Sequence, residues 1–145
     1  MTWLPVSPDR RGDRNGVLGL YPEAYTRHRE FLEACAAAAD HDLLELSRAR
    51  MAQMLRCREE LARHSPALLA RLHSWYEEPS FSELQRATLG FVEQFVLDPS
   101  LVSREMLAPL EAELGTSGVL DFTTVLSAYE ASLRLSTLLD LEPST

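Results

Sequence analysis

Apolar residues recur at steps of three and four along most of this chain, and nowhere do they alternate with polar residues at a step of two. A step near 3.6 residues puts one apolar stripe on an α-helix, whereas a half-buried strand needs a step of two. The clearest stripes lie within residues 25–35, 43–61, 68–76, 84–96 and 106–114. We therefore predict an all-α protein, a compact bundle of about six helices joined by short loops.

Residues that start or stop helices divide these stripes into segments. Proline fits the first turn of a helix, and Ser or Asp fits the capping position before it. Asp40 or Asp42 is expected to cap the second helix, and Ser80 with Glu83 forms a predicted capping box for the fourth. Gly115 is expected to close the fifth. The expected helices are 22–39, 41–64, 66–78, 81–97, 104–114 and 117–139.

The first 20 residues differ from the rest of the chain. They are rich in Pro, Gly and Arg and have no apolar period, which predicts an irregular N-terminal arm over residues 1–20. Trp3 and Leu4 either pin this arm to the body or to a neighbouring subunit, or the terminus is loose. Residues 21–145 show no repeat and no further shift in composition, so we expect a single all-helical domain there.

The charge balance argues against two classes of partner. The net charge is −8 and no basic block offsets it, so a phosphate backbone would be repelled and we expect no nucleic-acid partner. No apolar run reaches the length of a membrane span, and the N-terminus lacks the apolar core of a signal peptide. We expect no membrane partner and a cytoplasmic location, in which Cys35 and Cys57 remain thiols.

The complete absence of lysine excludes several classes of enzyme mechanism. All 14 basic residues are arginine, so the chain has no Schiff-base lysine and no phosphate-binding loop of the Walker A type. The six scattered glycines give no dinucleotide-binding fingerprint. Any chemistry must therefore use Glu, Asp, His, Cys, Tyr, Ser and Arg side chains, or a metal.

Reactive side chains concentrate in one stretch, ELSRARMAQMLRCREELARH, between Glu45 and His64. On a helix, Cys57, Glu60 and His64 stand at i, i+3 and i+7 and project from one face, so the carboxylate and the imidazole can share a proton. Glu45 lies fifteen residues before Glu60, which is roughly 22 Å along a straight helix. Glu45 can join the others only if the chain bends near residues 54–56.

This stretch also has simpler interpretations. Glu60 and His64 fit a surface ion pair worth a few tenths of a kcal/mol, of a kind common on helices. They also fit half of a metal site, although Glu45 and His73 are the only evident further ligands, so no metal is predicted. The arginines of this stretch are expected to be solvated, with their stems over apolar surface: Arg48, Arg50, Arg56, Arg58 and Arg63.

The spacing of this stretch resembles the carboxymuconolactone decarboxylase and alkyl hydroperoxidase D-like family. Its peroxidase branch carries a glutamate and, about twelve residues later, a Cys-x-x-Cys-x-x-x-His motif, which Glu45, Cys57 and His64 match while Glu60 replaces the second cysteine. The decarboxylase branch commonly has Glu-x-x-x-His, as in Glu60-Leu-Ala-Arg-His64. The passages FSELQRATLGFVEQFVLDPSLVSREMLAPL and SAYEASLRLSTLL are also similar to that family, over about residues 20–140. Family members often have Asn-Gly or a similar breaker before the first cysteine, where this chain has Leu55-Arg56.

The resemblance implies an alkyl hydroperoxidase D-like bundle and a cofactor-free lyase or isomerase that acts on a small oxygenated acid, lactone or related metabolite. An enolate intermediate of such a reaction needs an acid/base group and a group that stabilises the oxyanion. By resemblance, His64 would be the acid/base, Glu60 would tune it, and Glu45 would lie behind them or relay protons. Arg134 is a candidate for holding a substrate carboxylate. The family's assemblies imply a homotrimer or homohexamer.

Two alternatives belong to other functional classes. One is a thiol-dependent alkyl hydroperoxidase-like redox protein that uses Cys57. It lacks a second thiol at the right spacing to resolve the intermediate, so it would need an external thiol. The other is a non-catalytic helical oligomer subunit, which has the fold without the chemistry and whose candidate site is filled by side chains.

Overall fold

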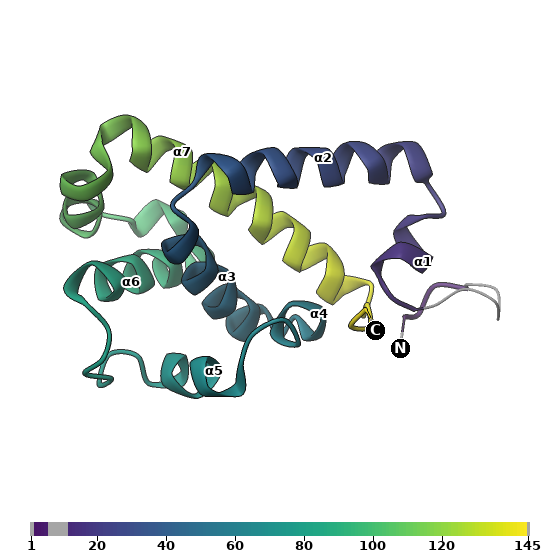
Figure 1. The fold of residues 1–145 in the computed structure, drawn as a ribbon, viewed down its shortest axis with the longest axis horizontal. Coiled ribbons are helices and arrows are strands. Elements are labelled where there is room, and N and C mark those ends of the chain that lie inside the picture. The colour runs from purple at the N-terminus through teal and green to yellow at the C-terminus, as the bar shows by residue number, and fades with distance from the viewer. Residues whose placement is uncertain (1, 6–11, 145) are drawn as a thin grey trace.

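The computed structural model describes residues 2–5 and 12–144, and over these residues the protein is all-α, as predicted (Figure 1). The described part contains seven α-helices and one 3₁₀-helix: α1 (Arg14–Leu18), α2 (Pro22–Ala38), α3 (His41–Leu55), α4 (Arg58–Leu61), α5 (Pro66–His73), α6 (Glu83–Leu97), η1 (Pro99–Leu101) and α7 (Arg104–Leu138).

The main hydrophobic core lies where α2, α3, α6 and α7 pack together, with α7 running obliquely across α2 (Figure 1). Its largest fully buried side chains are Phe91, Phe122, Leu44, Met51, Leu110 and Leu126. A second cluster, which includes Leu72, Phe81 and Leu89, attaches α5 to α3 and α6. The predicted apolar stripes thus converge on one body.

Asp40 caps its helix as expected, and two serines cap other helices in the same way. The side chains of Asp40, Ser65 and Ser103 each accept a hydrogen bond from a backbone N–H in the first turn of the helix that they precede. The capping box predicted at Ser80 and Glu83 is wrong, because the box is formed two residues later by Ser82 and Gln85. Ser80 instead donates to Glu78 and accepts from Arg71.

Gly115 marks a sharp change of direction within α7, where two helices were expected. Its backbone angles are φ 72° and ψ 168°, which are not helical, and α7 bends at this point (Figure 1). A residue with a Cβ is strained in this region of backbone space, so glycine is suited to the position.

The N-terminal segment is more ordered than the expected irregular arm. Residues 1 and 6–11 lie outside the described part, but α1 forms a short helix that Asp13 caps through Gly16 N. Val17 packs with Leu139 and Leu141 in a third cluster, and Trp3 Nε1 donates to Leu138 O at 2.7 Å. The described arm is therefore attached to the chain's own C-terminal end.

Among the described helices, none combines the length and the apolar character needed to cross a membrane.

Candidate functional site

A bend at Arg56 brings Glu45 back to the residues that follow it. Arg56 is left-handed, with φ 55° and ψ 38°, so α3 ends there. The Cys57 N–H donates to Ala52 O and the Arg56 N–H donates to Gln53 O, which is the Schellman pattern of helix termination. The bend thus occurs although the sequence has Leu55-Arg56 in place of an Asn-Gly breaker. The exposed Arg56 adopts a left-handed conformation that glycine adopts more easily.

Two carboxylates and an imidazole lie in a row at this bend, with one hydrogen-bonded contact and one longer contact beyond hydrogen-bond distance. His64 Nε2 lies 3.1 Å from Glu60 Oε1, and His64 Nδ1 lies 3.8 Å from Glu45 Oε2. The side chains of His64 and Glu60 are 4% and 7% exposed, whereas that of Glu45 is 40% exposed. The row therefore runs from a partly solvated carboxylate, through a buried imidazole, to a buried carboxylate.

Arg48 supplies the positive charge of this cluster. Its Nη2 lies 2.7 Å from Glu60 Oε1 and its Nη1 donates to Glu45 Oε1 at 3.2 Å. Burial by itself raises the pKa of the Glu60 carboxyl, but the hydrogen bond with His64 and the charge of Arg48 outweigh it and lower that pKa to about 2. Glu60 is therefore a carboxylate at neutral pH, and its own affinity for a proton is weak.

The interpretation of Arg48 as a solvated arginine is wrong. Its side chain is 12% exposed and its guanidinium carbon lies 4.4 Å above the centre of the Tyr129 ring, a cation–π arrangement. Its Nε is buried without a hydrogen-bond acceptor. Arg48 is thus fixed between an aromatic face and the Glu60 carboxylate, whose charge raises the pKa of the guanidinium although burial by itself lowers it.

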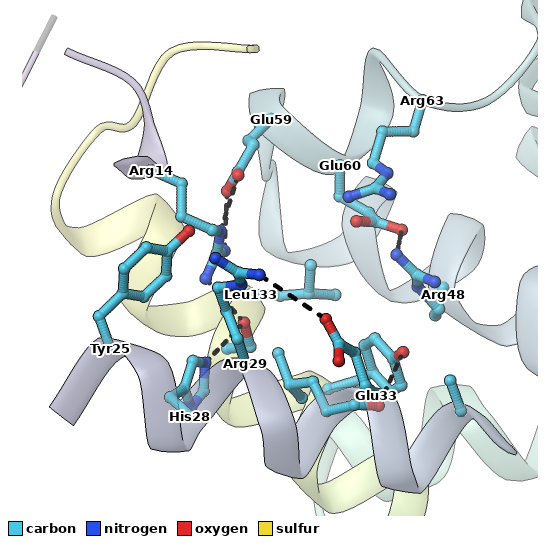
Figure 2. A pocket seen from close by; sticks show the side chains of 14 residues that line it. Arg14, Tyr25, His28, Arg29, Glu33, Arg48, Glu59, Glu60, Arg63 and Leu133 are labelled. Atoms are coloured by element: carbon cyan, nitrogen blue, oxygen red, sulfur yellow. Dashed lines mark hydrogen bonds and ion pairs between the residues drawn. The ribbon is translucent and has the colours of Figure 1, made fainter. Parts of the chain in front are cut away.

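A cavity of about 300 Å³ lies between α2, α4 and α7. Figure 2 shows Tyr25, His28 and Arg29 on α2 facing Glu59, Glu60 and Arg63 across it. Glu60 lines this cavity, whereas His64, Glu45 and Cys57 do not. The group of the acid–imidazole row that meets the cavity is therefore Glu60, and the predicted acid/base His64 is in contact with it one helical turn away.

A second charged network closes the cavity on the side of α1. Arg14 donates to both oxygens of Glu59, from Nε at 2.7 Å and from Nη2 at 2.8 Å, and its Nη1 donates to Ser132 Oγ at 3.2 Å. Ser136 Oγ donates to Glu59 Oε2 at 2.7 Å. His28 Nε2 lies 3.4 Å from Ser132 Oγ, and burial together with the charge of Arg14 lowers the pKa of His28.

Two cations of the cavity wall are not neutralised in this way. Arg63 is exposed, and its side chain makes no hydrogen bond or ion pair with any described residue. Among the described residues, the one carboxylate in contact with Arg29 is that of the exposed Glu33, at a long 3.9 Å, and its guanidinium also lies over the Tyr25 ring. Because a guanidinium beside a cavity that lacks a close carboxylate partner favours an oxyanion, these two arginines are the candidate anion-binding groups of the site.

The remaining predicted site residues lie elsewhere. Cys57 is fully buried at the start of α4 and does not line the cavity. Arg134 is 55% exposed, pairs with Glu130 at 2.8 Å, and does not line the cavity either. Among the described residues no three His, Cys, Asp or Glu side chains are placed to hold a metal ion.

Several groups of the site were not among the sequence-predicted residues. Arg48 could have been found, because it stands one turn after Glu45 on the same helical face. The place of His28 in the cavity wall depends on how α2 packs on α7, which the spacing of residues along α2 does not give. Arg14 had no signal at all, since its partner Glu59 lies 45 residues away.

Comparison of the sequence with models of known protein families and with curated proteins finds no match.

Proposed function

We propose that this protein is a cofactor-free lyase or isomerase that moves a proton on a small oxygenated acid, lactone or related metabolite bound in the cavity. The observation that carries the proposal is the position of Glu60. It joins the cavity to a buried imidazole and, through that imidazole, to a partly exposed carboxylate. A linear set of such groups can take a proton from a substrate and deliver it to solvent.

The reaction begins with an anionic substrate held by Arg63 and Arg29. The Glu60 carboxylate accepts the proton from a carbon next to a carbonyl, and the electron pair of the broken C–H bond moves onto the carbonyl oxygen as an enolate. The guanidinium charges stabilise that oxygen. Protonation at a different carbon then gives an isomer. If carbon dioxide leaves instead, the electron pair of the broken C–C bond forms the enolate of the product, and a proton taken up from solvent through His64 and Glu60 protonates its carbon.

His64 completes the transfer. A carboxylate whose pKa is about 2 is a poor final acceptor, so the proton passes from Glu60 to His64 Nε2, in the tautomer that carries its hydrogen on Nδ1 and leaves Nε2 free to accept. The proton on His64 Nδ1 faces the partly exposed Glu45 carboxylate, which passes a proton to solvent. In this proposal Glu60 contacts the substrate and His64 holds the proton. The acid/base role that the resemblance assigned to His64 alone is thus divided between two residues.

The resemblance to the carboxymuconolactone decarboxylase and alkyl hydroperoxidase D-like family supports the proposal, because Glu45, Glu60 and His64, three of the four motif positions, are the residues in this row. A homotrimer or homohexamer stays a prediction of that resemblance. Light scattering coupled to gel filtration tests it, and a clean 16.3 kDa monomer would count against the family.

The test needs no knowledge of the natural substrate. A panel of small oxo- and hydroxy-acids and lactones is incubated with the protein in D₂O, and proton NMR follows loss of the signals of carbons next to carbonyl groups. Catalysed exchange is expected, and both Glu60→Gln and His64→Gln are expected to lower it by at least a hundredfold. The control is Arg27→Gln, which removes an exposed arginine of α2 whose side chain is 77% exposed.

The two alternative functions predict different results. A redox protein would consume peroxide with an external thiol and lose that activity in Cys57→Ser. A non-catalytic subunit would exchange no proton of any compound in the panel. The pairing of Arg48 with Glu60 favours this second alternative, because it leaves Glu60 the weaker base. Exchange that is equal in wild type and Glu60→Gln would disprove the proposal.

A further inference from the structure

Beside the charged cavity lies a second hollow of opposite character. It has a volume of about 340 Å³, lies between α1, α2 and α7, and is lined by Leu18, Tyr21, Ala24, Tyr25, His28 and Leu135. Most of these side chains are apolar, and neither an acidic residue nor an arginine lines it. We call it the apolar groove.

The cavity and the apolar groove meet at two side chains. Tyr25 and His28, one turn apart on α2, line both of them. The guanidinium carbon of Arg29 lies 5.7 Å above the Tyr25 ring, so a cation borders the end of the groove. A single molecule could pass over these two residues with one end among arginines and the other among leucines.

The geometry points to an amphipathic carboxylic acid as the ligand, with its carboxylate at Arg29 and Arg63 and its hydrocarbon chain in the apolar groove. This inference rests on the proposed function, since the head group occupies the same cavity, and it names the substrate class. Only arginines without a strong partner are available to the head group, because Arg14 and Arg48 are neutralised by Glu59 and Glu60. A flat guanidinium matches a carboxylate through two parallel hydrogen bonds.

The binding free energy gained by burying the ligand's hydrocarbon chain sets how affinity should change with chain length. Burying one methylene contributes about 0.8 kcal/mol, which corresponds to about fourfold in affinity for a fully covered group. Tyr21 and Ala24 are exposed, so the groove covers the chain only in part. We expect affinity to rise about two- to fourfold per methylene from butanoate to octanoate.

Isothermal titration of straight-chain acids from acetate to octanoate tests the inference. Arg63→Gln is expected to weaken every acid by about tenfold. Ala24→Glu places a carboxylate at the exposed wall of the groove and should remove the gain with chain length while leaving acetate unchanged. The matched control is Ala37→Glu, an exposed alanine of the same helix that does not line the groove, which should behave as wild type.

Two further ligands test the head group. Octanol carries the chain without the charge, and octyl phosphate carries a different anion. Both are expected to bind at least tenfold more weakly than octanoate. Equal or tighter binding of either would overturn the assignment of a carboxylate.

The result is separable from that of the proposed function. Affinity that does not change with chain length, or an equal effect of Ala24→Glu and Ala37→Glu, would overturn the inference even if Glu60-dependent exchange were observed on short acids. If Ala24→Glu instead dissociated an oligomer, the groove would belong to a second copy of the chain. Chain-length-dependent binding that persists in Glu60→Gln without any exchange would support the ligand class and disprove the enzyme.

Discussion

Arg14 and Glu59 form a two-pronged ion pair although 45 positions separate them, with Nε–Oε1 at 2.7 Å and Nη2–Oε2 at 2.8 Å. Their side chains are only 17% and 9% exposed. Ser136 of α7 donates to the same carboxylate. With Ser136, the pair therefore joins α1, α4 and α7 at the position next to Glu60, and it fixes the position of the cavity wall on this side.

Removal of Arg14 is expected to destabilise the fold. In Arg14→Gln the nearly buried Glu59 carboxylate loses its charge partner, which should lower the free energy of unfolding by about 3 kcal/mol. Urea denaturation measures this. The matched control is Arg134→Gln, which breaks an exposed pair with Glu130 and should cost no more than about 0.5 kcal/mol. Equal losses in both variants would show that the Arg14 pair is an ordinary surface contact.

Glu60 should make stability depend on acid pH. Its pKa in the fold, about 2, lies below its ordinary value of 4.5, so the carboxylate stabilises the fold above pH 4.5. That contribution, roughly 3 kcal/mol, is lost as the pH falls from 4.5 towards 2. The excess stability of wild type over Glu60→Gln should therefore shrink between pH 6 and pH 3.

The control for this titration is Glu30→Gln, an exposed glutamate of α2 whose side chain is 59% exposed. The difference between wild type and this variant should stay nearly constant over the same pH range. Chemical denaturation at each pH gives both differences. A constant difference for Glu60→Gln as well would contradict the lowered pKa of Glu60.

Arg56 is expected to be a position where glycine stabilises the protein. A non-glycine residue with φ 55° pays a conformational cost of about 1 kcal/mol, and the Arg56 side chain is exposed. Arg56→Gly should raise the free energy of unfolding by about 0.5 kcal/mol after the extra freedom of glycine in the unfolded chain is deducted. Arg56→Ala, which keeps the strain, should give no gain. Thermal unfolding of the two variants compares them, and a loss in Arg56→Gly would contradict the left-handed bend.

Gly115 and Gly90 should respond in opposite ways to alanine. An alanine Cβ at Gly115 would meet no atom within 4 Å, so only the backbone strain at φ 72° opposes it, at about 1–3 kcal/mol. Gly90 lies inside α6 with its nearest neighbour at 3.7 Å, and alanine there should add about 0.5–1 kcal/mol. Denaturation curves of the two variants check the signs. A stabilised Gly115→Ala would mean that α7 is straight there.

Cys57 is expected to be unreactive in the folded protein. Its side chain is fully buried, and Cys35 is 7% exposed with a pKa that burial raises. Because thiol reagents attack the accessible thiolate, Ellman's reagent should label neither cysteine until the chain unfolds. In denaturant it should label both. Rapid labelling of Cys57 in the native protein would favour the thiol-dependent alternative.

The sequence predicted the acidic and imidazole groups of the site but not the residues that form the cavity wall. Local spacing was enough to predict that Glu60 and His64 meet, because residues four apart on a helix are neighbours. The meeting of Glu45 with His64 was predicted only on condition of a bend, and Leu55-Arg56 gave no sign of one. The left-handed conformation of Arg56 is imposed by tertiary packing of its neighbours. Met51 and Ala52 before it and Cys57 after it are all fully buried, which fixes the turn between them.

By itself, then, the sequence determined the all-α class, most helix starts and the pairing of Glu60 with His64, since periodicity, caps and one-turn neighbours depend on residues close along the chain. The tertiary structure alone decided that Glu60 rather than His64 faces the cavity, that Arg14 closes it, and that Arg134 lies outside it. Those facts depend on how α1, α2, α4 and α7 pack against one another. Packing joins residues far apart in sequence, and no local pattern encodes which side chains such contacts leave facing a cavity.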